Sequence, residues 1–160
     1  MRTITRLSGM VGDDAVLVPA WHGGRLPVDR YEWVPAATTD LTDGIRRVRR
    51  DDTPWPGSLP APSPAVVPAT SRPAVLADDD GEPVTVNGRG ELSADPATLA
   101  IDDAPPRAVV GWSGAWPLDE CWWDPARHRR AARLQVLTDD GAAHLVLAEH
   151  RRWWVAATYG

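Results

Sequence analysis

A cysteine and a histidine close together in the sequence are the residues best suited to nucleophilic chemistry. Cys121 lies shortly before His128. Such a pair can catalyse acyl transfer when the histidine takes the thiol proton and a third group orients the histidine. Acidic residues surround the cysteine at Asp119, Glu120 and Asp124. Because negative charges oppose formation of the reactive thiolate, the sequence argues against a catalytic cysteine, and we expect a chain that is not an enzyme.

Residue types that bind metals or phosphate are present without the spacing that those sites need. The histidines are dispersed and lack a ligand spacing such as H-x-x-x-H. The acidic segment 78–81 lacks the ligand series of an EF-hand loop and is typical of a hairpin turn. The glycine-containing segments 22–25 and 88–90 lack the strand–loop–helix context of a phosphate loop. We therefore expect no metal and no cofactor.

Tryptophans and arginines dominate the segment from 111 to 133. Tryptophan and arginine are typical of binding hot spots in protein interfaces. The same residues can also bind a single nucleic-acid strand, with indoles stacked on bases and guanidinium groups on phosphates. The alternative is that the indoles are core and that nearby carboxylates neutralise the arginines. The predicted partner-binding residues are Trp116, Trp122, Trp123, Arg127 and Arg130.

Composition excludes several classes of protein. The 160 residues carry a formal net charge of −5, which argues against a generally basic nucleic-acid binder. All 17 basic residues are arginine, and a single cysteine allows no internal disulfide. No signal peptide is recognisable, and no apolar run approaches the roughly 20 residues of a membrane span. We expect a cytoplasmic protein without membrane contact.

The first half of the chain predicts a small arm followed by a connector. Residues 3–11 have helical periodicity, and 15–18 and 31–34 are typical of strands. The proline-rich stretch 54–73 cannot form a helix interior or a central strand, because proline lacks a backbone donor. We therefore predict a small β/α arm over 1–53 and a proline-rich connector over 54–73.

The second half, 74–160, is predicted to be a β-rich interaction domain. Its expected strands are 74–76, 83–86, 107–112, 133–138, 144–148 and 153–159, with a turn or short helical piece within 118–128. Trp153 and Trp154 are adjacent in the last strand, so they should face opposite sides. The predicted fold class is mainly β with a minor α component. It is a small antiparallel sheet or partly open barrel, with a short N-terminal helix and the proline-rich connector.

The order of the motifs resembles the C-terminal region of actinobacterial ImuB-type proteins, the polymerase-like subunit of a damage-inducible mutasome. The resemblance covers nearly the whole chain, and its most specific parts are the block Gly111–Pro125 and the terminal tryptophan pair. The motifs are Val18–Arg25, Trp33–Pro35, Pro54–Pro64, Gly88–Ser93, Gly111–Glu120, Trp122–Pro125, Ala132–Val136 and Arg152–Tyr159.

The resemblance implies an adaptor. ImuB-type proteins look like Y-family DNA polymerases without the catalytic carboxylates. They join the sliding clamp, an error-prone C-family DNA polymerase and a RecA-like ImuA-type partner, and the region beyond the little finger is associated with the latter two. The chain looks like an excised C-terminal fragment of such a protein. Gln135 lies in a predicted strand, so we find no clamp motif of the Gln-x-x-Leu type and expect no clamp binding here.

The functional hypothesis is therefore a non-catalytic adaptor module of a DNA-damage-inducible translesion synthesis complex. It would bind the RecA-like partner, the error-prone polymerase or both, and reach DNA through the rest of the complex. The main alternative is a single-stranded-DNA-binding module that uses the same tryptophans and arginines. A third possibility is a structural extension that stabilises a little-finger domain.

Overall fold

A computed structural model describes residues 2–21, 25–39 and 61–160. The chain divides into two compact units, Met1–Ser58 and Leu59–Gly160. Each unit is considered by itself. The predicted glycine turn 22–25 and the first part of the predicted connector lie largely outside the described residues.

The first unit contains a short helix and a two-stranded hairpin. Its elements are α1 (Arg2–Val11), β1 (Leu17–Trp21) and β2 (Tyr31–Pro35), with single 3-10 turns at Asp13–Ala15, Val28–Arg30 and Ala36–Thr38. Gly12 ends the helix with a φ of 96°, a backbone conformation that glycine adopts without steric cost. β1 and β2 pair antiparallel from Leu17 opposite Pro35. The short N-terminal helix predicted from sequence is confirmed.

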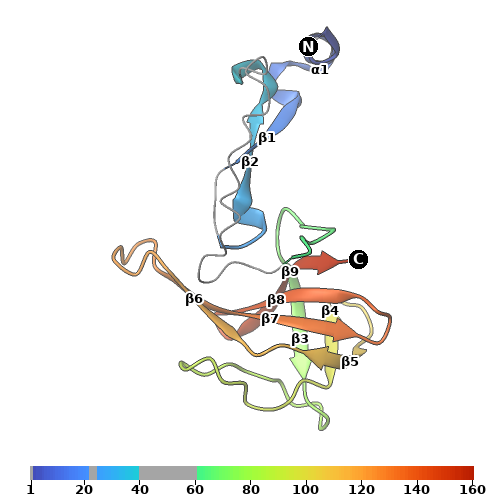
Figure 1. Ribbon diagram of the computed structural model, residues 1–160, viewed down its shortest axis with the longest axis vertical. Helices are drawn as coiled ribbons and strands as arrows, with labels where there is room; N and C mark the ends of the chain where they lie inside the picture. The colour runs from blue at the N-terminus through green and yellow to red at the C-terminus, as the bar shows by residue number, and fades with distance from the viewer. Residues whose placement is uncertain (1, 22–24, 40–60) are drawn as a thin grey trace. The chain divides into compact units, whose positions relative to one another are not determined.

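The second unit is a closed antiparallel barrel (Figure 1). Its strands are β3 (Arg72–Ala77), β4 (Thr98–Ile101), β5 (Arg107–Trp112), β6 (Trp116–Glu120), β7 (Arg129–Thr138), β8 (Ala143–Glu149) and β9 (Arg152–Tyr159). Six of them close the barrel in the order β3, β4, β5, β7, β8, β9, and β9 pairs back with β3. The predicted mainly β fold is confirmed, and the barrel is closed rather than partly open.

The long strand β7 supports both the barrel and a projecting hairpin. β8 pairs with one edge of β7 from Ala132 to Leu137. The other edge is shared, because β5 pairs with its C-terminal part and β6 pairs with its N-terminal part. The hairpin formed by β6 and β7 therefore continues past the point where β5 closes the barrel (Figure 1).

The barrel interior is filled by aliphatic side chains and one indole. Its buried members are Leu76, Val84, Leu99, Leu134, Val136, Val146, Trp153 and Val155. Trp153 is only 6% exposed, and its indole Nε1 donates to the carbonyl of Val84 at 2.7 Å. A buried tryptophan needs such a partner for its N–H group. Trp154 next to it is half-buried, so the predicted division between the two tryptophans is confirmed.

Two predicted segments differ in part from the structure, and one strand was not predicted. Residues 118–120 belong to the end of β6, whereas the turn predicted within 118–128 is confirmed for the residues that follow. Residues 83–86 form only isolated bridges, Pro83 with Ala77 and Val86 with Leu92. The actual neighbour of β3 is β4, which the sequence analysis missed. β4 has only 4 residues, too few to show a period.

Candidate functional site

The loop between β6 and β7 is built as two successive turns. Cys121 has a φ of 51°, which redirects the chain as it leaves β6. The amide of Asp124 then donates to the carbonyl of Cys121 at 2.8 Å, and the amide of Arg127 donates to the carbonyl of Asp124 at 3.0 Å. The Asp124 carboxylate also accepts from the amide of Ala126 at 3.1 Å. These bonds give the loop a defined conformation before any partner arrives.

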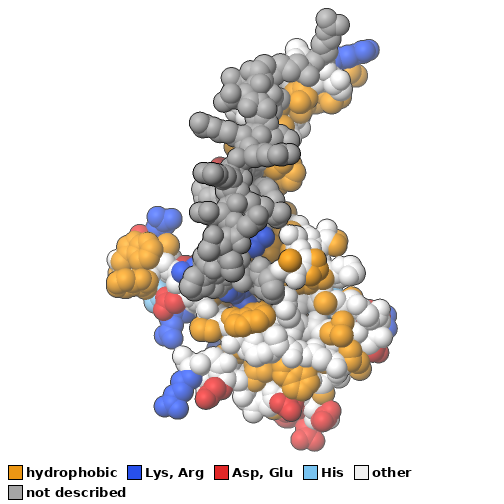
Figure 2. Space-filling view, viewed as in Figure 1, with side chains coloured by type: hydrophobic (Ala, Val, Ile, Leu, Met, Phe, Trp, Pro, Cys, Tyr) orange, Lys and Arg blue, Asp and Glu red, His pale blue; other side chains and the backbone are white. Residues whose placement is uncertain are grey.

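This loop presents two indoles to solvent. Trp122 is 71% exposed and Trp123 is 69% exposed. The ring centroids are 5.8 Å apart and the rings stand at 87°, an edge-to-face pair. Figure 2 shows hydrophobic side chains gathered at the hairpin tip, next to basic ones. Two of the predicted site residues are therefore surface residues rather than core.

Charged side chains fix the hairpin below its tip. Nε2 of His128 lies 2.8 Å from Oδ1 of Asp119, across the two strands. Arg129 on β7 donates from Nε and Nη2 to the two carboxylate oxygens of Glu149 on β8, at 2.7 and 3.1 Å. Its Nη1 also lies 3.9 Å from Glu120 on β6. Arg129 thus ties three neighbouring strands together.

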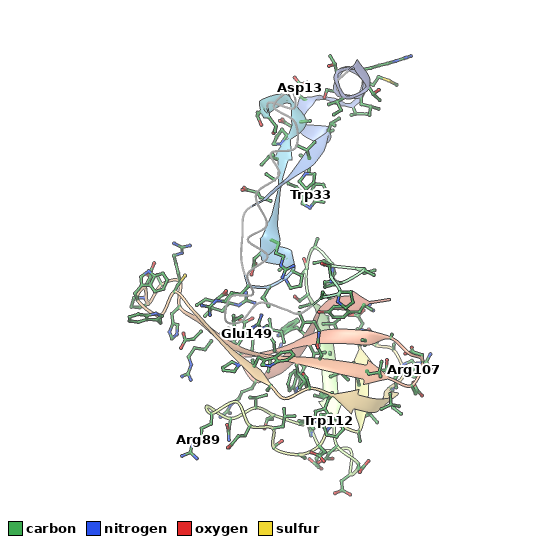
Figure 3. All side chains as sticks on the ribbon, viewed as in Figure 1. Asp13, Trp33, Arg89, Arg107, Trp112 and Glu149 are labelled. Atoms are coloured by element: carbon green, nitrogen blue, oxygen red, sulfur yellow. The ribbon has the colours of Figure 1, made fainter. Side chains whose placement is uncertain are left out.

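A groove of about 560 Å³ lies at the base of the hairpin. It is lined by residues 84–88 and 90, 117–119, 130–132 and 148–153. The buried side chains of Val84, Ala132 and Trp153 make an apolar floor. Figure 3 shows Arg89 and Glu149 at this end of the barrel and Arg107 at the other.

The groove has a positive rim even though the chain is acidic. Its two carboxylates are already engaged, Asp119 with His128 and Glu149 with Arg129. Within the described part of the chain, Arg130, Arg151 and Arg152 have no ion pair. The groove can therefore attract a negatively charged ligand.

The turn between β8 and β9 carries Arg151, one of the arginines at the rim of the groove. His150 and Arg151 have φ values of 50° and 62°. Positive φ at both central positions is the requirement of a type I′ hairpin turn, which normally selects asparagine and glycine. Residues with larger side chains pay a steric cost there. The turn thus holds Arg151 at the groove at the expense of backbone strain.

The five predicted site residues do not form one surface. Trp122, Trp123 and Arg127 lie in the loop, and Arg130 lines the groove. Trp116 is half-buried on β6, opposite Arg133 of β7. Because successive strand residues alternate faces, Trp116 lies on the other side of the hairpin from Arg130.

Sequence reasoning missed the contribution of the turn between β8 and β9. Arg151 and Arg152 lie between the predicted strands 144–148 and 153–159, and neither is among the predicted site residues. A sequence signal was present, because the run Glu-His-Arg-Arg lies between two predicted strands. A tight turn at that point usually contains small residues such as glycine or asparagine, so two adjacent arginines there indicate a role beyond the turn. The sequence of residues 84–90 does not indicate that they line the groove, since their position depends on the three-dimensional course of the chain at the barrel.

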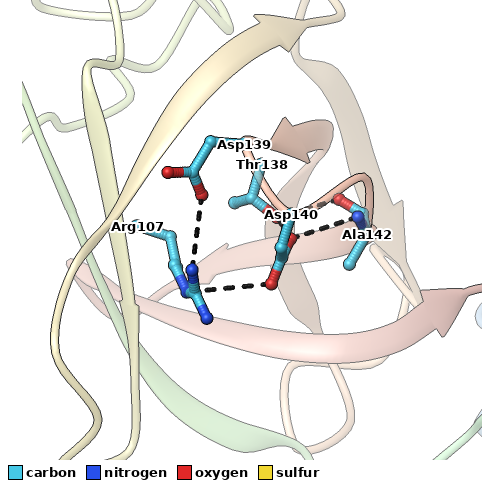
Figure 4. A network of polar contacts seen from close by, with 5 residues as sticks. All are labelled: Arg107, Thr138, Asp139, Asp140 and Ala142. Carbon is cyan, nitrogen blue, oxygen red and sulfur yellow. Dashed lines mark hydrogen bonds and ion pairs between the residues drawn. The ribbon is translucent and has the colours of Figure 1, made fainter.

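The opposite end of the barrel carries an acidic turn with a structural role (Figure 4). Asp140 is held by the Thr138 hydroxyl at 2.7 Å and by the amide of Ala142 at 3.2 Å. These bonds, with a smaller contribution from Arg107, keep the pKa of Asp140 below its usual value. Arg107 lies 3.7 Å from Asp140 and 3.9 Å from Asp139, joining β5 to the turn after β7.

The residues considered for catalysis are placed in structural contacts. Cys121 is half-buried at the start of the hairpin loop, and His128 is directed to Asp119. In the described ranges, no group of three or more histidine, cysteine or carboxylate side chains is arranged to hold a metal ion. No described helix is long and apolar enough to cross a membrane. Comparisons with protein-family models, with curated proteins and with solved structures found no match.

Proposed function

We propose that this chain is a non-catalytic protein-interaction module whose docking element is the loop of the β6–β7 hairpin. The observation that carries the proposal is the pair of exposed, mutually packed indoles of Trp122 and Trp123. Large exposed aromatic groups mark interaction surfaces, because burying them releases much apolar area from water.

The loop geometry makes such docking efficient. A partner that binds a mobile loop must also offset the entropy of ordering it. Here the backbone bonds at Asp124 and the Asp119–His128 contact already hold the loop in place. More of the free energy from indole burial is then available for affinity. Arg127 adds an exposed cation beside the indoles, the residue combination typical of interface hot spots.

The biological setting proposed here comes from the motif resemblance to ImuB-type proteins. It suggests an adaptor in a DNA-damage-inducible translesion synthesis complex of the cytoplasm. The partners proposed are the RecA-like ImuA-type protein, the error-prone C-family DNA polymerase, or both. Clamp binding is not assigned to this region, and contact with DNA would come through the rest of the complex.

A second candidate function is single-stranded-DNA binding. It is favoured by the unpaired arginines at the groove, since arginines and exposed indoles are the usual components of such sites. The ring geometry favours the adaptor. Successive bases stack best on ring faces that follow one another along a strand, whereas these two rings are perpendicular and pack edge to face.

A retention assay separates the two functions. The purified chain is immobilised at physiological salt and offered the RecA-like protein, the polymerase or a labelled single strand. We expect at least one protein to be retained, and the double variant Trp122→Ala, Trp123→Ala to weaken retention at least about tenfold. Trp33→Ala is the matched control, because that indole is 63% exposed in the other unit.

Circular dichroism and urea unfolding must show that both variants fold as the wild type does. A folded double variant that still retains both proteins at wild-type strength would overturn the proposal. Retention of the oligonucleotide alone, with a steep loss as salt rises, would favour the single-strand alternative.

A further inference from the structure

The groove at the base of the hairpin lies on one face of the sheet. Pro117, Ala132, Ala148 and Trp153 are in register across β6, β7, β8 and β9 and make its floor. β6 is the last strand of the sheet, and in the described region it pairs only with β7. Residues 117–119 of β6 line the groove, with the segment 84–90 forming the facing wall.

The facing wall closes one end of this space. A Cβ at Gly90 would lie 3.9 Å from the carbonyl oxygen of Ala115 and from Cδ of Pro117. The segment 84–90 thus approaches the beginning of β6 closely.

We propose that the groove binds an acidic segment of a partner protein, which lies across this face of the sheet. Apolar side chains of the segment would lie on the floor beside Val84, and its carboxylates would lie near Arg130, Arg151 and Arg152. The proposal rests on the adaptor function and gives it a second, chemically distinct contact.

The groove chemistry favours a peptide over a nucleic-acid strand. Base recognition needs exposed aromatic faces. The one indole among the groove residues is Trp153, which is 6% exposed with its N–H bound to the Val84 carbonyl, and the exposed ring at the groove is the small imidazole of His150. The floor is otherwise small and aliphatic, which suits leucine or valine side chains. Charge complementarity then selects an acidic sequence.

Binding of a short fluorescent peptide that alternates glutamate and leucine tests this proposal on the full chain. Anisotropy gives the dissociation constant, and amide shifts in NMR spectra report the location. We expect the triple variant Arg130→Gln, Arg151→Gln, Arg152→Gln to bind roughly tenfold more weakly, because each exposed charge contributes a modest amount. Arg6→Gln is the matched control, an exposed arginine of α1 that does not line the groove.

The NMR spectra locate the peptide. The largest amide shifts should occur in 118–119, 84–90 and 150–152, the segments that line the groove.

The groove proposal and the adaptor proposal can fail independently. Absent peptide binding, equal binding by the triple variant, or shifts elsewhere would overturn the groove proposal. So would tighter binding of a single-stranded oligonucleotide that depends on the same arginines. The adaptor proposal would stand after any of these if the double variant Trp122→Ala, Trp123→Ala still weakens protein retention. Peptide binding in the groove without retention of either protein would support the groove and contradict the named partners.

Discussion

Arg129 and Glu149 form a two-point ion pair across neighbouring strands, with N–O distances of 2.7 and 3.1 Å. The pair lies where the hairpin leaves the barrel, and both side chains are partly shielded from water. It therefore couples the support of the docking loop to the stability of the sheet.

Replacing Arg129 with methionine should lower the free energy of unfolding by roughly 1–2 kcal/mol, since a charge-assisted bond is lost and Glu149 is left partly buried. Urea unfolding measures the change. In a double-mutant cycle with Glu149→Gln, the two effects should be clearly non-additive. Additive effects would show that the pair contributes nothing to stability.

Tryptophans at the loop and in the core should respond oppositely to truncation. Trp153→Ala should cost about 3–5 kcal/mol, because it leaves a cavity and removes the donor to Val84. Trp122→Ala should stay within about 0.5 kcal/mol of wild type, since the indole is exposed. Thermal and urea unfolding of both variants check this contrast. A large loss of stability in Trp122→Ala would mean that the loop indole supports the fold.

The pH dependence of stability should carry a contribution from His144. Burial lowers the pKa of this histidine, Arg72 lowers it further, and Asp140 acts in the opposite direction. As pH falls through about 6.5, the unfolded chain takes up the proton before the folded chain does. The contribution is thus complete above that pH and is lost as pH decreases.

Unfolding of the wild type and of His144→Gln at a series of pH values isolates this contribution. The variant should lose stability less steeply on acidification below about pH 6.5. His144 also lies with Nδ1 3.1 Å from the Thr158 hydroxyl, a contact that glutamine can replace in part. Identical slopes for the two proteins would exclude the buried histidine as a source of acid sensitivity.

Glycine at position 151 should stabilise the barrel while weakening ligand binding. Arg151 has a φ of 62°, so Arg151→Gly relieves a steric cost and should raise stability by roughly 0.5–1 kcal/mol. The same change removes a cation from the groove and should weaken the acidic peptide several-fold. Urea unfolding and peptide anisotropy measure the two effects. A destabilised variant would show that the arginine side chain supports the turn.

Strand patterning predicted much of the barrel. The segment 133–138 alternates, whereas 144–148 and 153–159 are mostly apolar runs next to turn residues, and all three belong to the long strands β7, β8 and β9. Their adjacency follows from short turns, so the meander was predictable from local sequence. The short strand β4 was not, because burial in the barrel stabilises it and its own pattern does not.

The candidate site was only partly predictable for a related reason. Trp122 and Trp123 were identified by residue type, and their exposure follows from a turn at Cys121 that residue propensity does not predict. The groove joins residues 84–90 to the turn at 150–151, segments far apart in the sequence. Such a juxtaposition depends on barrel closure, which no single segment encodes.

The shared edge of β7 has an evolutionary consequence. Because β5 closes the barrel on one part of that strand and β6 occupies the other, the loop 121–128 lies outside the set of contacts that keeps the barrel folded. Substitutions or insertions in the loop can then change partner choice without being filtered by selection for the core. Recognition by the loop can therefore change while the barrel keeps its fold.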